Sequence, residues 1–350
     1  MNNRTIRITD GAFVVHRIAF TESQKYYLVK KENMERRTFL QSGLALPFFP
    51  MPYQQRTFVE SENLVIEKSQ PGKPHAGKVL AAIQPHSDDI PIFAAGTVAK
   101  LIAEGYTGYL IQMTNDDHAG AGATVGEVIM NNEKDTQGVA KALGLRKVYN
   151  LYYRNHRLDN VSPVEIRSRL IFLIRMLKID TIVCYDPSGH YEENPDHYVT
   201  AKAWEAARWM SGGRLDYPEH FDAGLQPHSV QEMYYFARGP QLVNRIVDIS
   251  DHIDTKVAAN LANTSQGPAG HNGSRLRQRL ASEGKQLDLL GNTDDEADQN
   301  YIKHYVLDRD SKRSRGIPSD RELGEQFGLG WAEAFYYRGP AENKMDEYIK

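Results

Sequence analysis

Short apolar runs alternate with segments of helical periodicity from residue 78 onward, and this alternation restricts the folds open to the chain. The apolar runs of strand length are residues 78–83, 108–113, 147–152 and 181–185. The segments with apolar residues at helical spacing are 91–104, 125–143, 163–177 and 195–210. Repeated strand and helix units of this kind predict an α/β fold, with a Rossmann-like, mostly parallel sheet covered by helices on both faces.

The C-terminal part of the chain has a less regular pattern. Apolar residues predict further strands and helices, and the acidic run predicts a loop. The expected elements are strands at 232–237 and 245–249, helices at 251–263 and 274–290, and a loop at 292–298. We therefore expect one domain over residues 78–345, in which the last part is a C-terminal extension of the sheet domain.

The residues that precede the first predicted strand divide into two parts. Residues 56–77 are polar and end in a Pro/Gly-rich stretch, which is typical of a linker or surface loop. Residues 1–55 are predicted to be an N-terminal extension. Within it, Arg36 and Arg37 precede Phe39 and a mildly apolar stretch, and this pattern resembles a twin-arginine export signal. The signal predicts a periplasmic or secreted protein, whereas an ordinary flexible extension leaves the protein cytoplasmic.

Composition narrows the classes of partner. The chain of 350 residues has 42 Lys and Arg against 45 Asp and Glu, a formal net charge of −3. That balance does not favour nucleic acid or an anionic membrane surface. Because the chain lacks an uninterrupted apolar stretch of about 18 residues, no membrane span is expected. The remaining expectation is a small-molecule or oligosaccharide substrate, and the oligomeric state is left open.

Metal-ligand residue types follow two of the predicted strands. His86 and Asp89 come after the first strand, and His197 lies in the loop and helix start after the strand at 181–185. In open parallel sheets, ligands bind beyond the carboxyl ends of the strands. Two imidazoles and one carboxylate around zinc leave a coordination position for water, as in catalytic zinc sites. The same donors also suit other divalent transition metals.

Asp88 stands next to the predicted ligand Asp89. A zinc ion lowers the pKa of a bound water to about 7, and a neighbouring carboxylate can then act as general base. The alternative is structural: Asp88 or Asp89 caps the helix that begins near Ile90. A dinucleotide-binding oxidoreductase is disfavoured, because no Gly-x-Gly-x-x-Gly follows the first strand.

At these residues the sequence resembles the LmbE-like, or PIG-L, family of zinc-dependent N-acetylglucosaminyl deacetylases. The family signature is Ala-His-Pro-Asp-Asp after the first strand and His-Pro-Asp-His later, and this chain has Pro-His-Ser-Asp-Asp at 85–89 and Asn-Pro-Asp-His at 194–197. The resemblance extends over about residues 78–250, and residues 331–335 look like the closing segment of the family. It implies an LmbE-like fold, zinc bound by His86, Asp89 and His197, and Asp88 as the base that activates water for removal of an N-acetyl group.

Two residues depart from the family pattern. Ser87 replaces a proline, which is expected to change loop stiffness more than chemistry. Asn194 stands where the family has a histidine that supports the oxyanion; its amide can donate a hydrogen bond but cannot protonate the leaving amine. Asn194 followed by Pro195 is also an ordinary helix start. His190 is a candidate to replace the missing histidine, and an exposed loop histidine is the alternative.

Asp117 and His118 follow the second strand and are predicted to contact substrate, although surface turn chemistry explains His118 equally well. The family's substrate-binding arginine is absent from residues 130–134, which makes a phosphate-bearing substrate less favoured. Two alternatives remain open for the function. The first is an amidase acting on another N-acyl group or a thiol-sugar conjugate, and the second is a non-catalytic carbohydrate-binding member of the same fold.

Overall fold

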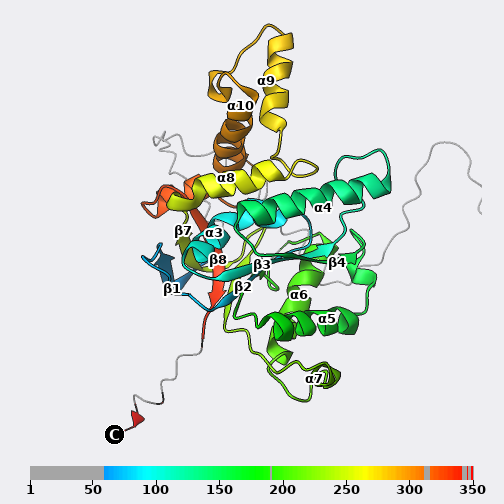
Figure 1. Ribbon diagram of the computed structural model, residues 1–350. Helices are drawn as coiled ribbons and strands as arrows, with labels where there is room; N and C mark the ends of the chain where they lie inside the picture. The colour runs from blue at the N-terminus through cyan, green and yellow to red at the C-terminus, as the bar shows by residue number, and fades with distance from the viewer. Residues whose placement is uncertain (1–58, 190, 311–315, 341–344, 346–347, 350) are drawn as a thin grey trace, which may run out of the picture. The chain divides into compact units, whose positions relative to one another are not determined.

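A computed structural model of the chain describes residues 59–189, 191–310, 316–340, 345 and 348–349. The predicted N-terminal extension with its export signal, and His190, lie outside the described residues. Within them, eight strands form one sheet in the order β1-β7-β8-β6-β5-β2-β3-β4 (Figure 1). The strands are β1 (Val59–Glu67), β2 (Val79–Gln84), β3 (Thr107–Thr114), β4 (Val148–Tyr153), β5 (Thr181–Tyr185), β6 (Glu232–Phe236), β7 (Leu242–Asp248) and β8 (Ala332–Arg338).

The sheet is mostly parallel, which confirms the predicted α/β class. Neighbouring strands from β4 through β6 pair in parallel, as do β1 and β7, while β8 lies antiparallel between β6 and β7. The central strand β2 pairs with β3 on one side and β5 on the other. Its residues Leu80 to Ile83 have no exposed surface, as expected for a parallel strand covered on both faces.

Helices cover both faces of the sheet. In Figure 1, α3, α4 and α8 lie on one face, and α5 and α6 lie on the other. The α-helices of the described residues are α2 (Asp89–Phe93), α3 (Ala95–Ala103), α4 (Val125–Ala142), α5 (Pro163–Leu177), α6 (Pro195–Met210), α7 (Glu219–Asp222), α8 (Ile253–Ala262), α9 (Asn272–Ser282), α10 (Asp294–Tyr301) and α11 (Asp320–Gln326). Short 3-10 turns lie at Leu158–Asn160, Ser250–His252 and Asp288–Leu290, and a π-helix at Ile302–Asp310 continues α10.

The predicted elements of the first half agree with the structure to within a few residues, with two differences. The helix expected at 91–104 is divided into α2 and α3, because Ala94 has φ −143° and leaves the helical region. The segment expected to be a linker, 56–77, contains β1, which pairs with β7. The sequence gives little signal for this strand because it is an edge strand, with Val65 and Ile66 about half exposed.

The C-terminal part differs more from expectation. Residues 292–298 were expected to be an acidic loop, but α10 begins at Asp294 behind a capping box formed by Thr293 and Glu296. Acidic residues in a first helical turn are stabilised by the helix dipole, so the acidic run favours the helix start. The helix expected at 274–290 ends at Ser282, two residues before Gly284, whose φ is +67°.

A buried ion pair fixes α8 against the rest of the domain. Lys256 Nζ lies 2.7 Å from Asp320 Oδ2 and 2.6 Å from Glu333 Oε1, and all three side chains are inaccessible to solvent. Glu333 also accepts hydrogen bonds from the backbone N–H groups of Gly96 and Thr97 at the start of α3. Because a buried charge without a partner is strongly destabilising, this cluster holds α8 in one position.

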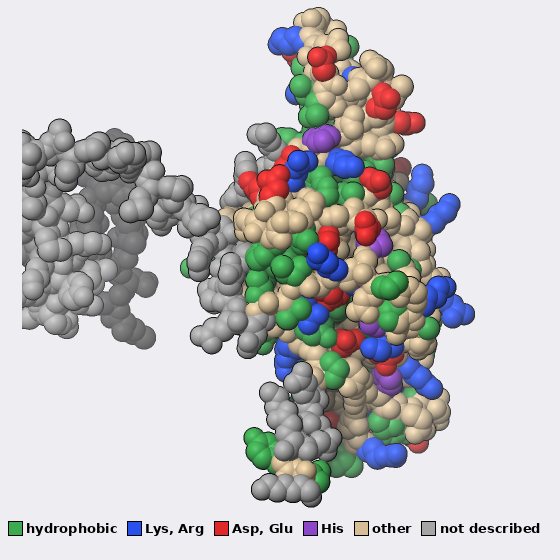
Figure 2. Space-filling view, turned by 90° about the vertical axis from the view of Figure 1, so that its left-hand side faces the viewer, with side chains coloured by type: hydrophobic (Ala, Val, Ile, Leu, Met, Phe, Trp, Pro, Cys, Tyr) green, Lys and Arg blue, Asp and Glu red, His purple; other side chains and the backbone are tan. Residues whose placement is uncertain are grey.

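The surface of the described residues is mixed in charge. On the face shown in Figure 2, basic and acidic side chains are interspersed, as the near balance of charges in the sequence requires. No described helix is both long enough and apolar enough to cross a bilayer.

Candidate metal centre

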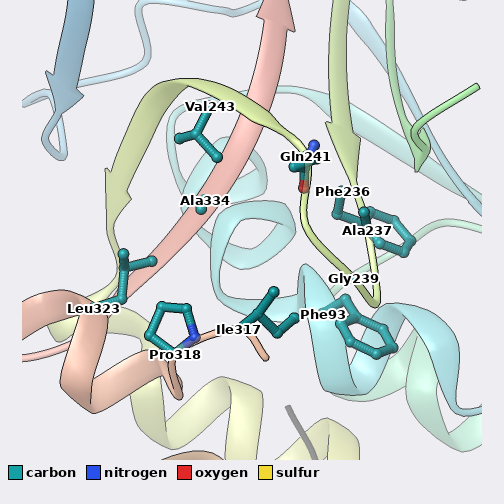
Figure 3. Close-up of a pocket in the computed structure, with 10 residues that line it drawn as sticks. All are labelled: Phe93, Phe236, Ala237, Gly239, Gln241, Val243, Ile317, Pro318, Leu323 and Ala334. Atoms are coloured by element: carbon teal, nitrogen blue, oxygen red, sulfur yellow. The ribbon is translucent and has the colours of Figure 1, made fainter. Parts of the chain in front are cut away.

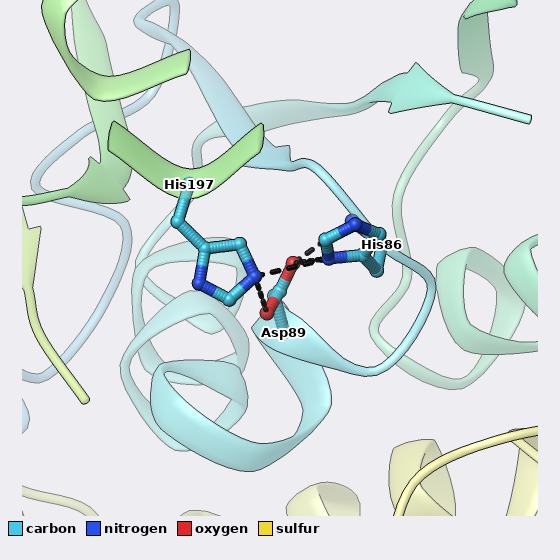
Figure 4. A group of neighbouring side chains, drawn as sticks. All are labelled: His86, Asp89 and His197. Carbon is cyan, nitrogen blue, oxygen red and sulfur yellow. Dashed lines mark hydrogen bonds and ion pairs between the residues drawn. The ribbon is translucent and has the colours of Figure 1, made fainter. Parts of the chain in front are cut away.

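The three predicted ligands meet at the carboxyl edge of the sheet. His86 follows β2, Asp89 is the first residue of α2, and His197 lies in the first turn of α6 after β5. Because β2 and β5 are parallel neighbours, their carboxyl ends bring these loops together. One side-chain donor atom from each residue lies within 4.8 Å of the other two. Figure 4 shows the two imidazole rings directed toward the Asp89 carboxylate.

The contacts between the three side chains are short. His86 Nδ1 lies 3.0 Å from His197 Nε2, and each of these nitrogens lies 3.4 Å from one oxygen of Asp89. All three residues are buried, with exposed fractions of 5% or less. Two imidazole nitrogens and a carboxylate at this separation form a donor set that a cation can share.

Acceptors behind the two rings determine where each imidazole carries its proton. His86 Nε2 lies 3.1 Å from Asp196 Oδ2, and His197 Nδ1 lies 3.2 Å from Glu192 Oε1. The hydrogen bond with Asp196 favours the proton on Nε2 of His86, so that Nδ1 of the neutral ring presents a lone pair, and Glu192 lies close enough to Nδ1 of His197 to favour the same arrangement there. Those two lone pairs converge on the same point, an arrangement that a shared cation stabilises. The residues therefore fit a divalent metal.

Electrostatics at this point favour positive charge. Burial lowers the pKa of His86, but hydrogen bonds with Asp196 and Asp89 outweigh burial and raise the pKa well above the usual 6.5. Burial raises the pKa of Asp89, but the neighbouring His197 and His86 hold it below its usual range. The carboxylates around the donor atoms therefore attract a cation, and Asp89 stays ionised.

Tyr185, at the end of β5, orients the predicted ligand Asp89. Its hydroxyl donates a hydrogen bond of 2.6 Å to Asp89 Oδ1, and its ring stacks on His197 with centroids 4.2 Å apart. The backbone N–H of His86 donates to Asp89 Oδ2. Both carboxylate oxygens are thus fixed. Tyr185 was not predicted as a site residue, although its position as the last residue of a strand beside the site was an available signal.

Asp88 lines an open cleft beside the donor atoms and is partly exposed. It is the N-cap residue of α2, yet its side chain makes no capping hydrogen bond. The capping alternative for Asp88 is therefore excluded by the geometry. Burial and the neighbouring Asp89 raise the pKa of Asp88 to about 6. A carboxylate with such a pKa, facing the cleft, can accept a proton near neutral pH.

The cleft holds about 420 Å³, within the range of about 300–1,000 Å³ typical of small-molecule sites. It is walled by the three donor residues, by residues at the start and within helix α2, and by residues from five separate loops. These are Asp88, Ile92, Phe93, Ala119, Asn155, His156, Asn194, Arg238, Gln266 and Pro268. Phe93 also lines a smaller apolar cavity on its other side, with Phe236, Ile317 and Leu323 (Figure 3). Phe93 thus separates the cleft from that cavity.

Asn194 combines the two roles that the sequence left open. Its Oδ1 accepts a hydrogen bond of 2.9 Å from the backbone N–H of Asp196 and caps α6. The residue also lines the cleft. Since Oδ1 is committed to the cap, the Nδ2 amide group is the end that remains to donate. Capping and donation to a bound ligand are therefore compatible.

Asp117 and His118 do not line the cleft. Asp117 is buried and accepts hydrogen bonds from Arg154 Nε at 2.8 Å and from the backbone N–H of Asn155 at 3.0 Å. It thereby fixes Asn155, whose side chain lies 3.1 Å from His86 Nε2. His118 is exposed, 3.3 Å from Asp117. The substrate contacts predicted for this pair stay a prediction, and in the structure Asp117 supports the loop behind His86.

Comparison with known proteins places these features in a class. Residues 81–208 match the profile of the PIG-L family, described as GlcNAc-PI de-N-acetylase. A diacetylchitobiose deacetylase of Thermococcus kodakarensis is 29% identical over 201 residues, covering 55% of this chain and 71% of the relative. Residues 81–208, the segment that matches the profile, contain all three donor residues and Asp88. Fold and site thus define an α/β domain in which a His-Asp-His group that could hold a metal lies at the carboxyl edge of the sheet. Residues 81–208 of the chain are similar to a PIG-L (LmbE-like) family domain.

Solved structures show the same fold. The N,N'-diacetylchitobiose deacetylase from Pyrococcus horikoshii superposes with a TM-score of 0.57 at 22% identity, over 77% of this chain and 88% of that chain. The 4-carboxy-2-hydroxymuconate hydratase GalB from Pseudomonas putida gives a TM-score of 0.51 at 16% identity, over 75% and 97% of the two chains. Since a deacetylase and a hydratase share this fold, the reaction has to be argued from the site.

Proposed function

We propose that this protein is a metal-dependent hydrolase that removes the N-acetyl group from an amino sugar or its glycoconjugate. The observation that carries the proposal is the convergence of His86, Asp89 and His197 beside Asp88 in an open cleft. The relatives named above support the substrate class, because two of them are deacetylases of an acetylated amino sugar. Zinc is the cation that we propose, since two imidazoles and one carboxylate are a donor set of catalytic zinc sites.

A divalent cation held by the three donors would supply Lewis-acid polarisation of the amide carbonyl and would acidify water in the cleft. Asp88 takes the proton from the attacking water in this proposal, which is supported by its position in the cleft lining and by the absence of a side-chain capping bond. The protonated Asp88 then returns that proton to the departing amine, so that acetate and a free amino sugar are released. A single carboxyl group thus serves first as base and then as acid.

Asn194 is the residue that we assign to the negative charge that develops on the carbonyl oxygen. Its Nδ2 group can donate a hydrogen bond there, because the cap holds the other end of the amide. Preorganised donors of this kind are effective because they need no reorientation during the reaction. An amide donor cannot protonate the amine, which leaves proton return to Asp88.

The test measures metal content and acetate release together. Purified protein is analysed for bound metal, stripped with a chelator and reloaded with zinc, manganese, iron or cobalt. Acetate release is followed with N-acetylglucosamine, its oligomers and an N-acylated thiol-sugar conjugate. We expect activity to disappear on stripping and to return with zinc. Stripped protein that hydrolyses as fast as the loaded protein would refute the metal dependence, and release from the thiol conjugate alone would transfer the proposal to the amidase alternative.

A further inference from the structure

The loop between α8 and α9, residues 263–271, forms one wall of the cleft. Gln266 and Pro268 line the cleft, and Gly267 packs on Asp88: a Cβ atom added there would lie 3.0 Å from Asp88 Oδ2. This loop lies beyond residues 81–208, the segment that matches the family profile. It therefore contributes to the site from the part of the chain that the family profile does not describe.

Helix α4 anchors this loop through a buried carboxylate. Asp135 accepts hydrogen bonds from the backbone N–H of Thr264 at 2.7 Å and of Ser265 at 2.6 Å, and from the Thr264 hydroxyl at 3.0 Å. Asp135 is 4% exposed, so these contacts are shielded from water. Gln266, the next residue along the chain, is thereby held at the cleft.

Ser87 joins the loop to the metal-binding segment. Its hydroxyl accepts hydrogen bonds from Gln266 Nε2 at 2.7 Å and from Asn263 Nδ2 at 3.2 Å, and donates to Asn132 Oδ1 at 3.3 Å. One donor and two acceptor positions are all that a serine hydroxyl offers. Ser87, which replaces a proline of the family signature, thus uses the donor and both acceptor positions of its hydroxyl. A proline at this position has no side-chain group that could make these hydrogen bonds.

The network determines which end of the Gln266 amide is left to accept a further hydrogen bond. Asn132 Nδ2 donates to the backbone carbonyls of Ala119 and Val128, so Asn132 Oδ1 must face Ser87 and Gln266. Gln266 Nε2 lies 3.1 Å from that oxygen, and only an NH₂ group can face both acceptors. Gln266 therefore has its Oε1 at the opposite end, and no described residue donates to it.

We propose that Gln266 is a specificity-determining residue that accepts a hydrogen bond from a hydroxyl or N–H group of the amino sugar, and that Ser87 positions it. The proposal rests on the proposed function. A carbonyl oxygen fixed at the cleft wall selects substrates that carry a donor at the matching position, because a substrate without it leaves the oxygen unpaired. Loss of the contact weakens substrate binding and leaves the reacting groups in place.

The experiment compares deoxy analogues of N-acetylglucosamine, each lacking one ring hydroxyl, on the zinc-loaded full chain. For the wild type, we expect kcat/KM to fall by roughly 3- to 10-fold with the analogue that lacks the contacted hydroxyl, the size of one neutral hydrogen bond. For Gln266→Leu, we expect the kcat/KM of the parent sugar divided by that of this analogue to approach 1. We also expect a higher KM for the parent sugar and a kcat close to that of the wild type. Gln266→Met replaces the leucine variant if the latter unfolds, as judged by thermal unfolding.

Ser87→Ala and the double variant test the positioning role. We expect Ser87→Ala to lose the same discrimination as Gln266→Leu with unchanged zinc content, and the double variant to lose no more than either single variant, since the two residues act as one unit. Gln286→Leu is the control, at an exposed glutamine that follows the C-terminal end of α9, and it should keep the wild-type ratios of kcat/KM between the parent sugar and each analogue.

The outcomes separate the two proposals. Wild-type protein that releases no acetate from any of these sugars would overturn the proposed function. If the wild type is active and Gln266→Leu has the same parent-to-analogue ratios of kcat/KM as the wild type, only the role of Gln266 is overturned. Additive losses in the double variant overturn the positioning role of Ser87.

Discussion

The two walls of the cleft are held by different forces. On the metal side, charged groups contact one another directly: Asp196 and Glu192 hold the two imidazoles, and Tyr185 holds Asp89. On the side of the α8–α9 loop, Ser87 and Gln266 are linked by neutral amide and hydroxyl contacts. Charge-assisted hydrogen bonds are about twice as strong as neutral ones. We infer that the metal side determines whether the reaction occurs, and the loop side determines which substrate is accepted.

Each wall contains one buried aspartate that receives two backbone N–H groups. Asp196 accepts from His156 and Leu158, and Asp135 accepts from Thr264 and Ser265. Only Asp196 also contacts a donor residue of the metal centre, His86. The same arrangement thus supports the candidate metal centre in one place and a wall of the cleft in the other, which makes the two aspartates suitable for a direct comparison.

The largest effect is expected from Asp88→Asn on the metal side. The amide cannot accept a proton from water, so kcat should fall by about 10²- to 10⁴-fold, the usual contribution of general acid–base catalysis. Metal content should be unchanged, because Asp88 is outside the donor set. Acetate release and metal analysis are measured on the same preparation. Asp254→Asn, at an exposed carboxylate, is the control; full activity in Asp88→Asn would show that another group is the base.

The next effect is expected from Asp196→Asn compared with Asp135→Asn. An amide that faces His86 Nε2 no longer holds the proton on that nitrogen as a carboxylate does, so zinc affinity should fall by about 10- to 100-fold. Asp135→Asn disturbs the loop but does not touch the donor residues, so its zinc affinity should stay near wild type. Competition with a coloured chelator measures both. Equal losses in the two variants would contradict the division of roles between the walls.

A smaller effect is expected from Gly267→Ala on the loop side. Gly267 has φ +82°, a conformation that costs an L-residue about 1–2 kcal/mol. The added methyl group would also press on Asp88, so we expect lower kcat in addition to lower stability. Gly72→Ala is the matched control, since Gly72 has φ +76° with no atom within 4 Å of an added Cβ. Both variants should lose similar unfolding free energy, and only Gly267→Ala should lose activity.

The sequence predicted the metal side of this comparison better than the loop side. His86, Asp89 and His197 could be placed together because parallel strands bring their carboxyl ends to one edge, and the three side chains do converge there. The α8–α9 loop could not be placed in the same way. Its contacts with Ser87 and Asp135 join residues more than 120 positions apart. Contacts between residues so far apart produce no local pattern in the sequence from which they could be predicted.

The fold shows the same division between local and distant signals. Strands β2 to β6 were predicted because each is a mainly apolar run, and β2 and β5, which are buried on both faces, have the most continuous runs. The edge strand β1 has no such run, and its pairing with β7 depends on a partner about 180 residues away. The helix α10 was missed although its signal was local, because the acidic run was interpreted as a loop and the capping box at Thr293 was not recognised.

The smallest effect is expected at His118. Asp117 and His118 were both predicted to contact substrate, and substitutions at the two positions should have different effects. His118 is exposed and lies outside the cleft, so His118→Ala should change kcat/KM by less than about 2-fold, as for an exposed ion pair. Asp117→Ala removes two hydrogen bonds that fix Arg154 and Asn155 behind His86, and should weaken zinc binding. Steady-state kinetics and zinc competition measure both. A large loss of kcat/KM in His118→Ala, with zinc affinity intact, would return this histidine to the substrate site and extend the cleft beyond its present walls.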